Sequence, residues 1–340
     1  GFQLSYAATL SIVMLSKNLK KMLTSARIPE IIADVLAVTL AAQIGVLPIT
    51  LFYFNRLSLI SIVPNILAGP VLELITVIGA MMALLGQISL ILSKLLGYLN
   101  NIFLSFVLFI TRISSDVSFA AITTVTPSPV FSAIYYTAVW FFLWYMPLKQ
   151  IRLKQKHIAA GLSALAVLIL VGSITPGKLE VTFIDVGQGD SAFIKTCTGR
   201  TVLIDGGGST NPDIASNVGE NTVIPFLLDK GVMRLDAVVA SHPHSDHIQG
   251  LMAVLGRIKT GMLIIPSMDD ESEFNQLLEI ASVKKVPVFR CFAGQTIWLD
   301  SKTKLEVLNP EAGCSCENGS VNNASLVLRL VFGETEVLFT

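Results

Sequence analysis

Charged side chains are scarce in this chain. Only 14% of the 340 residues are charged, while 52% are hydrophobic, and soluble proteins carry about 25% charged residues. This shortage excludes a chain that is soluble along its whole length. The first residue is not Met, and no signal peptide precedes the apolar opening. We expect the sequence to be a piece of a longer protein, truncated at both ends.

Cysteine is also rare, and its spacing argues against a special role. The four cysteines are Cys197, Cys291, Cys314 and Cys316, and no two of them form a CxxC pair. A bridge between Cys314 and Cys316 would enclose one residue, and so short a loop is usually strained. We expect neither a disulfide framework nor a thiolate metal site.

The net charge of zero conceals two halves of opposite sign. Residues 1–176 contain 11 Lys and Arg against 4 Asp and Glu, whereas residues 177–340 contain 13 against 20. The first half is apolar and basic, and the second is polar and acidic. The sequence therefore predicts a polytopic α-helical membrane domain in residues 1–176 and a soluble domain in residues 177–340.

Six apolar tracts precede Pro176, and a helix needs about 20 apolar residues to cross a membrane. The third tract is too long for one simple span, and we expect it to break at Gly69-Pro70, because proline interrupts helices. The six tracts are Phe2–Ser16, Ile31–Phe54, Leu57–Leu92, Leu95–Ile113, Val130–Leu148 and Ile158–Ile174.

The positions of Lys and Arg predict the orientation of these tracts. Basic clusters at residues 17–27 and 149–156 favour the cytoplasmic side. If Leu57–Leu92 counts as one crossing, the last tract runs outward and the soluble domain lies outside the cytoplasm. A second crossing at Gly69-Pro70 would invert this result.

One carboxylate lies inside an apolar tract. Glu73 follows Pro70 by three residues, and a carboxylate is costly in lipid. At the start of a half-helix the macrodipole would favour its charge. Both a channel role and a structural role remain open for Glu73. The amides of Gln43, Asn65 and Gln87 are better explained as hydrogen bonds between helices.

From Lys178 onward, short β-type runs alternate with helical ones. Leu179–Ile184, Ser191–Thr196 and Thr201–Ile204 have the alternation of strands, and Leu235–Ala240 is typical of a buried strand. A helix is predicted over Ile248–Ile258. Alternating strands and helices favour a layered α/β domain.

Histidine is as rare as cysteine, yet three of the four histidines fall within six residues. His242, His244, Asp246 and His247 directly follow the predicted buried strand. Imidazole and carboxylate are ligands for Zn, Mn and Fe. The spacing allows the first two histidines to share one ion, and Asp246 with His247 to reach a second.

These residues resemble a known signature. His242–His247 is similar to the HxHxDH motif of the metallo-β-lactamase superfamily, whose fold is an αββα sandwich. The surrounding sequence resembles the DNA-internalisation competence proteins of the ComEC type over both halves, on the segments Gly1–Leu10, Phe183–Ser191, Leu203–Gly207, Val223–Leu227 and Leu235–His244.

The resemblance implies a DNA-uptake channel of natural transformation in the cytoplasmic membrane, working with other competence-machinery proteins. One DNA strand would be transported, and a metal-dependent nuclease domain would degrade the other. His242, His244, Asp246 and His247 would hold two divalent ions, Mn or Zn, and Asp246 would accept the proton of the attacking water. Supporting roles are expected for Asp185, Asp190 and Asp205, with glycines 187, 189 and 206–208 allowing close backbone approach.

Two departures from the family pattern concern the metals. The stretch Ser320–Leu328, where relatives supply a further histidine, contains Asn322 and Asn323 instead. A bridging Asp is expected beyond Thr340. We therefore expect the chain as given to bind metal weakly and to be inactive.

Two other functions remain open. One is a membrane-anchored metallo-hydrolase of a small or lipid substrate, and the other is a non-catalytic scaffold domain on a channel. The acidic charge of residues 177–340 argues against strong independent DNA binding, because affinity for the phosphate backbone needs cations.

Overall fold

The computed structural model describes the chain except for residues 118–119, 146–176, 210–217, 269–271 and 314–320. Contacts divide the chain into two units, Gly1–Arg152 and Leu153–Thr340. The predicted boundary at residue 176, the apolar tract Ile158–Ile174 and the basic residues 149–156 all lie outside the described residues.

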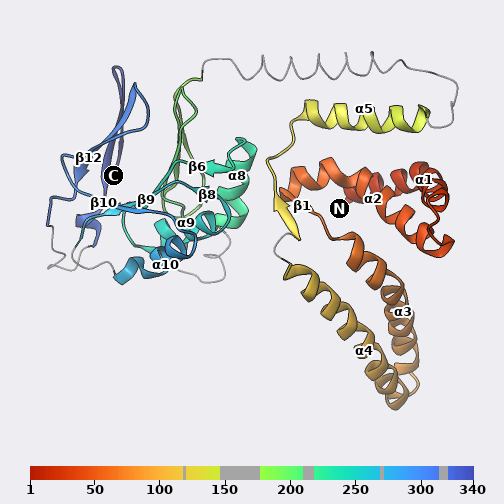
Figure 1. The fold of residues 1–340 in the computed structure, drawn as a ribbon. Coiled ribbons are helices and arrows are strands. Elements are labelled where there is room, and N and C mark those ends of the chain that lie inside the picture. The colour runs from red at the N-terminus through yellow and green to blue at the C-terminus, as the bar shows by residue number, and fades with distance from the viewer. Residues whose placement is uncertain (118–119, 146–176, 210–217, 269–271, 314–320) are drawn as a thin grey trace. The chain divides into compact units, whose positions relative to one another are not determined.

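The first unit is built of helices that follow the apolar tracts (Figure 1). Three of them, α2, α3 and α4, are long and apolar enough to cross a membrane. This finding confirms the prediction of membrane-type helices in this half. The helices are α1 (Phe2–Ser25), α2 (Glu30–Phe54), α3 (Ile62–Gly86), α4 (Leu90–Ser115) and α5 (Pro129–Tyr145).

The predicted break at Gly69-Pro70 is wrong. Helix α3 continues through Pro70 from Ile62 to Gly86, so Glu73 lies in a helix interior and not at the start of a half-helix. Proline removes a single hydrogen bond and costs about 3 kcal/mol, which the other bonds of a 25-residue helix outweigh in apolar surroundings. Glu73 is exposed on this helix.

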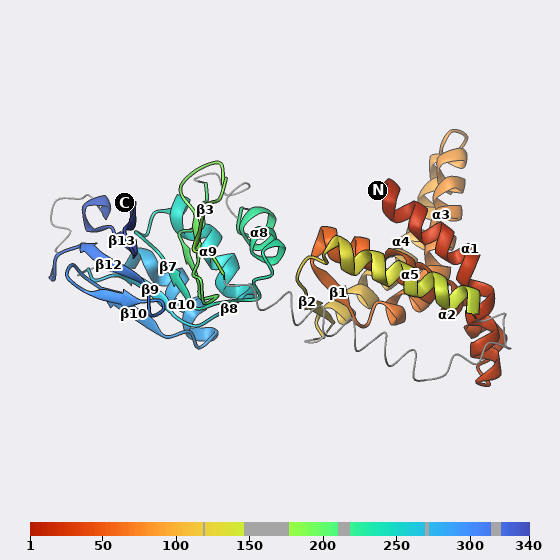
Figure 2. The same cartoon turned by 90° about the horizontal axis from the view of Figure 1, so that it is seen from above.

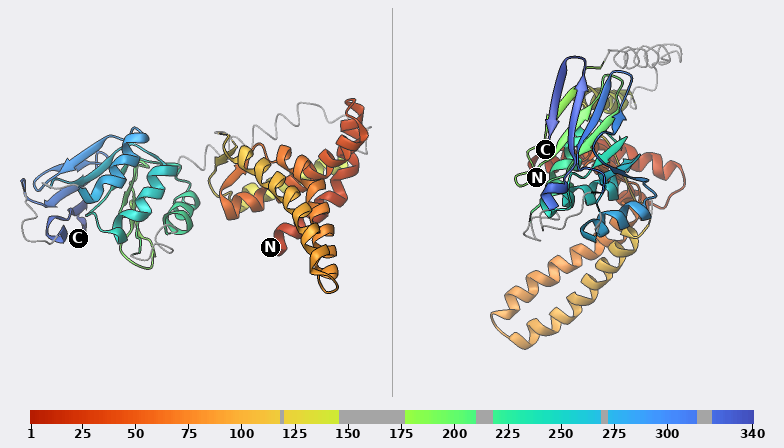
Figure 3. Two further views of the ribbon diagram at one scale, coloured as in Figure 1. Left: turned by 90° about the horizontal axis from the view of Figure 1, so that it is seen from below. Right: turned by 90° about the vertical axis from the view of Figure 1, so that its left-hand side faces the viewer.

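Helices α3 and α4 run side by side as an antiparallel hairpin (Figure 3). At its open end, β1 (Arg56–Ser58) pairs with β2 (Ala121–Thr123). Asn55 precedes β1 in a left-handed conformation, with φ 51°, and its Nδ2 donates to Thr126 Oγ1 at 2.7 Å. The sequence analysis missed this two-stranded sheet.

Small residues bring α1 and α2 into close contact. On the buried face of α2 every fourth residue from Ala33 to Gly45 is small, and a Cβ at Gly45 would lie 2.0 Å from Ser11 Oγ. Close backbone approach of this kind drives helix association in membranes. The residues of this face are Ala33, Ala37, Ala41 and Gly45.

A proline inside α2 is compensated by a tyrosine of α5. Pro48 has no N–H to donate to the carbonyl of Ile44, one turn earlier. The hydroxyl of Tyr135 donates to that carbonyl at 2.8 Å. The neighbouring Tyr136 hydroxyl donates to Gly45 O at 3.0 Å. A neighbouring helix thus satisfies the backbone group that proline leaves unpaired, as membrane helices require.

We predict that Tyr135→Phe destabilises the protein by about 1 kcal/mol, the usual scale for hydrogen bonds between membrane helices. In a Pro48→Ala background the cost should largely disappear, because residue 48 then donates to Ile44 O itself. Tyr136→Phe is the matched control, since Gly45 O also faces the N–H of Ile49. Thermal unfolding in detergent measures the four variants as a double-mutant cycle. If the cycle gave Tyr135 and Tyr136 the same interaction free energy with Pro48, this account would be contradicted.

The second unit contains a six-stranded sheet of mixed direction, in the order β10-β9-β7-β5-β4-β3. The strands β3, β4 and β5 are antiparallel, whereas β5, β7, β9 and β10 are parallel. The carboxyl ends of β5 and β7 therefore meet at one edge. The strands are β3 (Glu180–Phe183), β4 (Ala192–Lys195), β5 (Thr201–Ile204), β7 (Ala237–Val239), β9 (Leu263–Pro266) and β10 (Val288–Cys291).

Helices cover one face of this sheet, and a second sheet covers the other (Figure 2). The helices are α8 (Ile224–Asp229), α9 (Ser245–Arg257) and α10 (Asn275–Val283). The second sheet is antiparallel and consists of β11 (Thr296–Trp298), β12 (Thr303–Asn309), β13 (Val327–Phe332) and β14 (Thr335–Phe339). A short parallel pair joins β6 (Arg234–Leu235) to β8 (Lys259–Thr260).

The six-stranded sheet contributes side chains to two hydrophobic cores, one beneath the helices and one between the two sheets. In β5, Leu203 packs toward the helices, while Val202 and Ile204 pack toward the second sheet. Successive side chains of a strand point to opposite faces, so one strand can contribute to two cores. The layered α/β prediction is confirmed. The described residues form three of the four layers of the predicted αββα sandwich, namely one helix layer and the two sheets.

Candidate metal centre

The histidine loop lies where β7 ends and α9 begins. Ser241 to His244 form the turn, and Asp246 and His247 lie in the first turn of α9. A carboxylate at this position is stabilised by the positive end of the helix dipole. His247 is buried, His242 and Asp246 are half-buried, and His244 is exposed.

The fold brings the four predicted ligands together. The ring centroids of His242 and His244 are 4.8 Å apart, and those of His242 and His247 are 4.0 Å apart. Nε2 of His247 lies 3.9 Å from Oδ2 of Asp246. Three imidazoles and a carboxylate thus share one small volume at the carboxyl edge of the sheet.

Asp205, at the end of β5, connects this cluster to the sheet. Its Oδ1 accepts from the backbone N–H of Ser241 at 2.8 Å. Its Oδ2 accepts from Ser241 Oγ at 2.6 Å and from His247 Nδ1 at 2.9 Å. Asp205 is 3% exposed, so these donors replace the water that the carboxylate loses on burial.

The same hydrogen bonds define which ring nitrogens carry protons. Because Ser241 gives its hydroxyl proton to Asp205, its Oγ accepts from His242 Nδ1 at 2.9 Å. His247 likewise donates through Nδ1 to Asp205. In the neutral form, both rings then present an unprotonated Nε2. A metal-binding histidine commonly donates its other ring N–H in this way.

The two rings differ in basicity. Burial, followed by the nearby imidazole of His247, lowers the pKa of His242 to about 4. Burial also lowers the pKa of His247, but the hydrogen bond and charge of Asp205, with Asp246 and Asp190, outweigh it and leave that pKa raised. His242 is thus uncharged at neutral pH, the form in which imidazole binds metals.

Glycines let the β5 loop lie directly against α9. A Cβ at Gly250 would be 1.9 Å from Gly206 O, and one at Gly189 would be 1.8 Å from Asp246 O. The Gly206 N–H donates to His247 O at 2.8 Å. The close approach predicted for glycines 189 and 206–208 is present, whereas the position of Gly187 is open.

The other predicted residues lie at different distances from the cluster. Asp190 lines a pocket with Asp205, and its charge acts on His247. Asp185 instead accepts from Gly187 N in its own loop at 3.3 Å. Asn322 and Asn323 are exposed. Their segment is nevertheless tied to the loop, because Leu326 N donates to Ser241 O at 2.8 Å.

Sequence reasoning missed Ser241. This buried serine links Asp205 to both the backbone and the side chain of the histidine loop. Its position directly before the histidine motif was the available signal.

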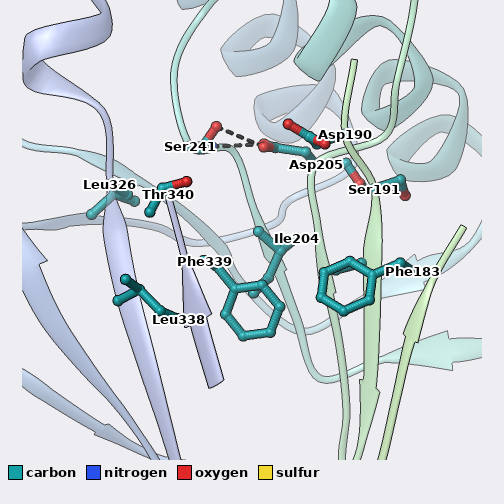
Figure 4. A pocket seen from close by; sticks show the side chains of 11 residues that line it. Phe183, Asp190, Ser191, Ile204, Asp205, Ser241, Leu326, Leu338, Phe339 and Thr340 are labelled. Atoms are coloured by element: carbon teal, nitrogen blue, oxygen red, sulfur yellow. Dashed lines mark hydrogen bonds between the residues drawn. The ribbon is translucent and has the colours of Figure 1, made fainter. Parts of the chain in front are cut away.

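A cavity of about 140 Å³ opens beside these residues (Figure 4). Asp190, Asp205 and Ser241 form its polar side. Its apolar side comes from both sheets, with Phe183 and Phe339 in tilted ring contact at 6.0 Å. The apolar lining includes Phe183, Ile204, Leu326, Leu338 and Phe339.

The residue types at the centre fit a divalent ion, although the histidine rings contact one another in edge-on and tilted arrangements. Across the residues that the structure describes, no three His, Cys, Asp or Glu side chains are arranged to hold an ion as they stand. The donor types are imidazole nitrogens and carboxylates, which suit Zn and Mn.

Each half of the chain matches a known protein family. Residues 1–149 match the sequence model of the family described as Competence protein, and residues 184–301 match that of the Metallo-beta-lactamase superfamily. The chain joins a competence domain to a metallo-β-lactamase domain. The second of these contains the histidine cluster and Asp205.

Two curated proteins are similar to this chain. The chain is 30% identical to ComE operon protein 3 of Bacillus subtilis (strain 168) over 352 residues, which cover 100% of this chain and 44% of that protein. It is 37% identical to Competence protein ComA of Neisseria gonorrhoeae over 108 residues, 30% of this chain and 14% of that one. The chain thus spans less than half the length of the curated relatives it matches.

A solved structure, Zn(2+)-bound PqqB from Methylobacterium extorquens, is 10% identical, with a TM-score of 0.28 over 44% of this chain and 51% of that one. A similarity this weak says nothing of function.

We predict that Asp205→Asn lowers the affinity for Mn²⁺ and Zn²⁺ by about 10–100-fold, the usual cost of losing a residue that orients a metal-binding histidine. Asparagine keeps the shape of the side chain and tolerates the φ of 56° at this position. Asp185→Asn is the matched control, because that carboxylate accepts only within its own loop. Equilibrium dialysis of the purified protein measures both. An equal loss in the two variants would contradict the role of Asp205.

Proposed function

We propose that this chain belongs to a DNA-uptake system of the cytoplasmic membrane, and that its lactamase domain is a metal-dependent phosphodiesterase that degrades the strand not transported. The observation that carries the proposal is the cluster of His242, His244, Asp246 and His247. These side chains are of the types that bind metals, and they occur in the same chain as a competence domain. Other proteins of the competence machinery and the lipid membrane would be its partners.

In this proposal each residue of the cluster has a separate task. His242, His244, Asp246 and His247 would hold two divalent ions, which would supply Lewis acidity toward water and the phosphodiester. Asp246 would accept the proton of the attacking water. Asp205 and Ser241 would fix the orientation of His242 and His247. The apolar side of the cavity would receive a base or sugar, while Asp190 stays on its polar rim.

The competence domain would provide the path for the transported strand. Glu73 is proposed as a channel residue, because its carboxylate is exposed on an apolar helix and lipid would disfavour its charge. A polar neighbour or a water-filled path would satisfy it.

A second candidate is a non-catalytic scaffold. Two observations favour it: among the described residues no three ligand-type side chains are arranged to hold an ion, and Ser320–Leu328 contains no histidine. A membrane-anchored hydrolase of small or lipid substrates is the third. These functions differ in the substrate that is cleaved, so one assay can separate them.

We predict that His242→Ala and Asp246→Ala each reduce divalent-metal-dependent DNA cleavage by the full-length protein at least 100-fold, while the domain stays folded. The ligands lie on a loop and the first turn of α9, outside the main core. Cleavage of single- and double-stranded DNA is measured with Mn²⁺, Zn²⁺ and Mg²⁺, together with metal content.

Glu311→Ala is the control variant, because Glu311 is exposed outside the cluster, and it should cleave normally. Full activity of either ligand variant would contradict the assigned site. Cleavage of phospholipids or small phosphodiesters but not DNA would favour the anchored hydrolase, and inactivity on every substrate would favour the scaffold.

We also predict that the lactamase domain faces outward. Short loops rich in Lys and Arg resist translocation, and an external nuclease would be kept away from the chromosome. A cysteine introduced at Glu311, with the native cysteines removed, should react with an impermeant thiol reagent on intact cells whose outer envelope is permeable. Reaction only after lysis of the inner membrane would mean that the domain is cytoplasmic.

A further inference from the structure

Cations of the lactamase domain gather at one end of its strands, the end opposite the histidine cluster. Asp205 and the histidine cluster follow the carboxyl ends of β5 and β7. Six exposed or half-exposed cations lie instead at the opposite edge, close before or after the strands that meet there. We call this edge the basic end; its cations are Lys178, Lys195, Arg234, Lys259, Lys284 and Lys285.

Strand register shows that these cations share one edge. Lys195, the last residue of β4, pairs with Thr201, the first of β5. Arg234 pairs with Lys259 just before β7 and β9 begin. Lys284 and Lys285 precede β10, which runs parallel to β9. Neighbouring strands are about 4.8 Å apart, so the cations follow one edge of the sheet, with Glu180 and Asp236 among them.

Two of these cations have a carboxylate nearby, because Lys195 lies opposite Glu180 in the register of β3 and β4 and the charge of Arg234 acts on Asp236. Nearby Arg200 and Lys230 are paired with Asp236 and Glu180. Among the described residues, by contrast, none of the six cations of the basic end forms an ion pair. Helix C-termini attract cations, which accounts for Lys284 and Lys285 after α10. Lys178, Lys195 and Arg234 do not follow a helix directly, so the helix dipole does not account for their positions.

Two hollows open on the basic end and share Lys195. One, of about 370 Å³, is lined by Lys195, Arg234 and the exposed Met233. The other, of about 720 Å³, is lined by Lys178, Lys195 and Cys197. Each hollow also contains a carboxylate, Asp236 in the first and Glu180 in the second, and these are paired with Arg200 and Lys230. An anionic group in either hollow would meet two cations that form no ion pair, and Met233 adds an apolar surface in the first.

We propose that the basic end binds the headgroups of anionic phospholipids and so holds the lactamase domain against the membrane surface. The chain enters this end at Gly177 and Lys178, directly after the apolar sequence Ile158–Ile174. Basic clusters next to a membrane segment are attracted to anionic lipid. This binding is independent of catalysis.

Cys197 lies in one of the hollows and reports on lipid contact. In full-length protein with the other cysteines replaced by Ser, its alkylation by an impermeant maleimide is measured in nanodiscs. Reaction should be at least fivefold slower in phosphatidylglycerol than in phosphatidylcholine discs, since each cation near an anionic surface contributes about fivefold. Added salt should restore the rate.

The double variant Lys195→Gln/Arg234→Gln should lose this protection, whereas Lys195→Arg/Arg234→Lys should keep it. A cysteine at Glu311, two residues beyond the far end of β12, should react equally in both lipids. Equal reaction of Cys197 in both lipids would overturn the proposal. Protection in phosphatidylcholine discs by duplex DNA or inorganic phosphate, equal to that by phosphatidylglycerol, would overturn it in favour of a nucleic-acid or free-phosphate site.

Discussion

Asp205 is buried where three segments of the lactamase domain meet, and its carboxylate accepts hydrogen bonds from two of them. Ser241 follows β7 and His247 begins α9, so one side chain fixes the end of a strand and the start of a helix. A buried carboxylate is stable only if such donors compensate its lost hydration. The orientation of His242 and His247 therefore depends on Asp205, and the glycine contacts along α9 hold the same segments at a fixed separation.

The sequence predicted the main parts of this centre but not their connections. The histidine motif after a hydrophobic strand correctly indicated a cluster at the carboxyl edge of the sheet. Asp185 and Asp205 both follow strands and looked equivalent, yet β5 adjoins β7 whereas β3 is the outer strand, two places further away. Strand order is a tertiary property, so sequence could not separate the two. Ser241 was missed because a single hydroxyl at a strand end has no distinctive pattern.

In the competence domain, the length of the apolar tracts predicted helices correctly, whereas the position of proline did not predict where a helix is interrupted. Gly69-Pro70 interrupts nothing in α3, and Pro48 lies inside α2. Rules for proline come from helices in water, where an interrupted helix can be hydrated, whereas an apolar environment favours keeping the remaining bonds. Tyr135 shows how a distant helix compensates. The strands β1 and β2 have three residues each, too few to show an alternation.

The carboxylates around the histidine cluster affect how this site could bind a phosphodiester. Asp190, Asp205 and Asp246 place three carboxylates around the histidines, and without cations this site would repel DNA. Two divalent ions would reverse the sign there and leave a small positive excess, enough to attract one phosphate but not a long stretch of backbone. Affinity for the strand as a whole would then have to come from elsewhere in the protein, so the centre would act on DNA that is delivered to it. Such an arrangement fits a domain that is joined to a membrane channel better than one that finds DNA by diffusion.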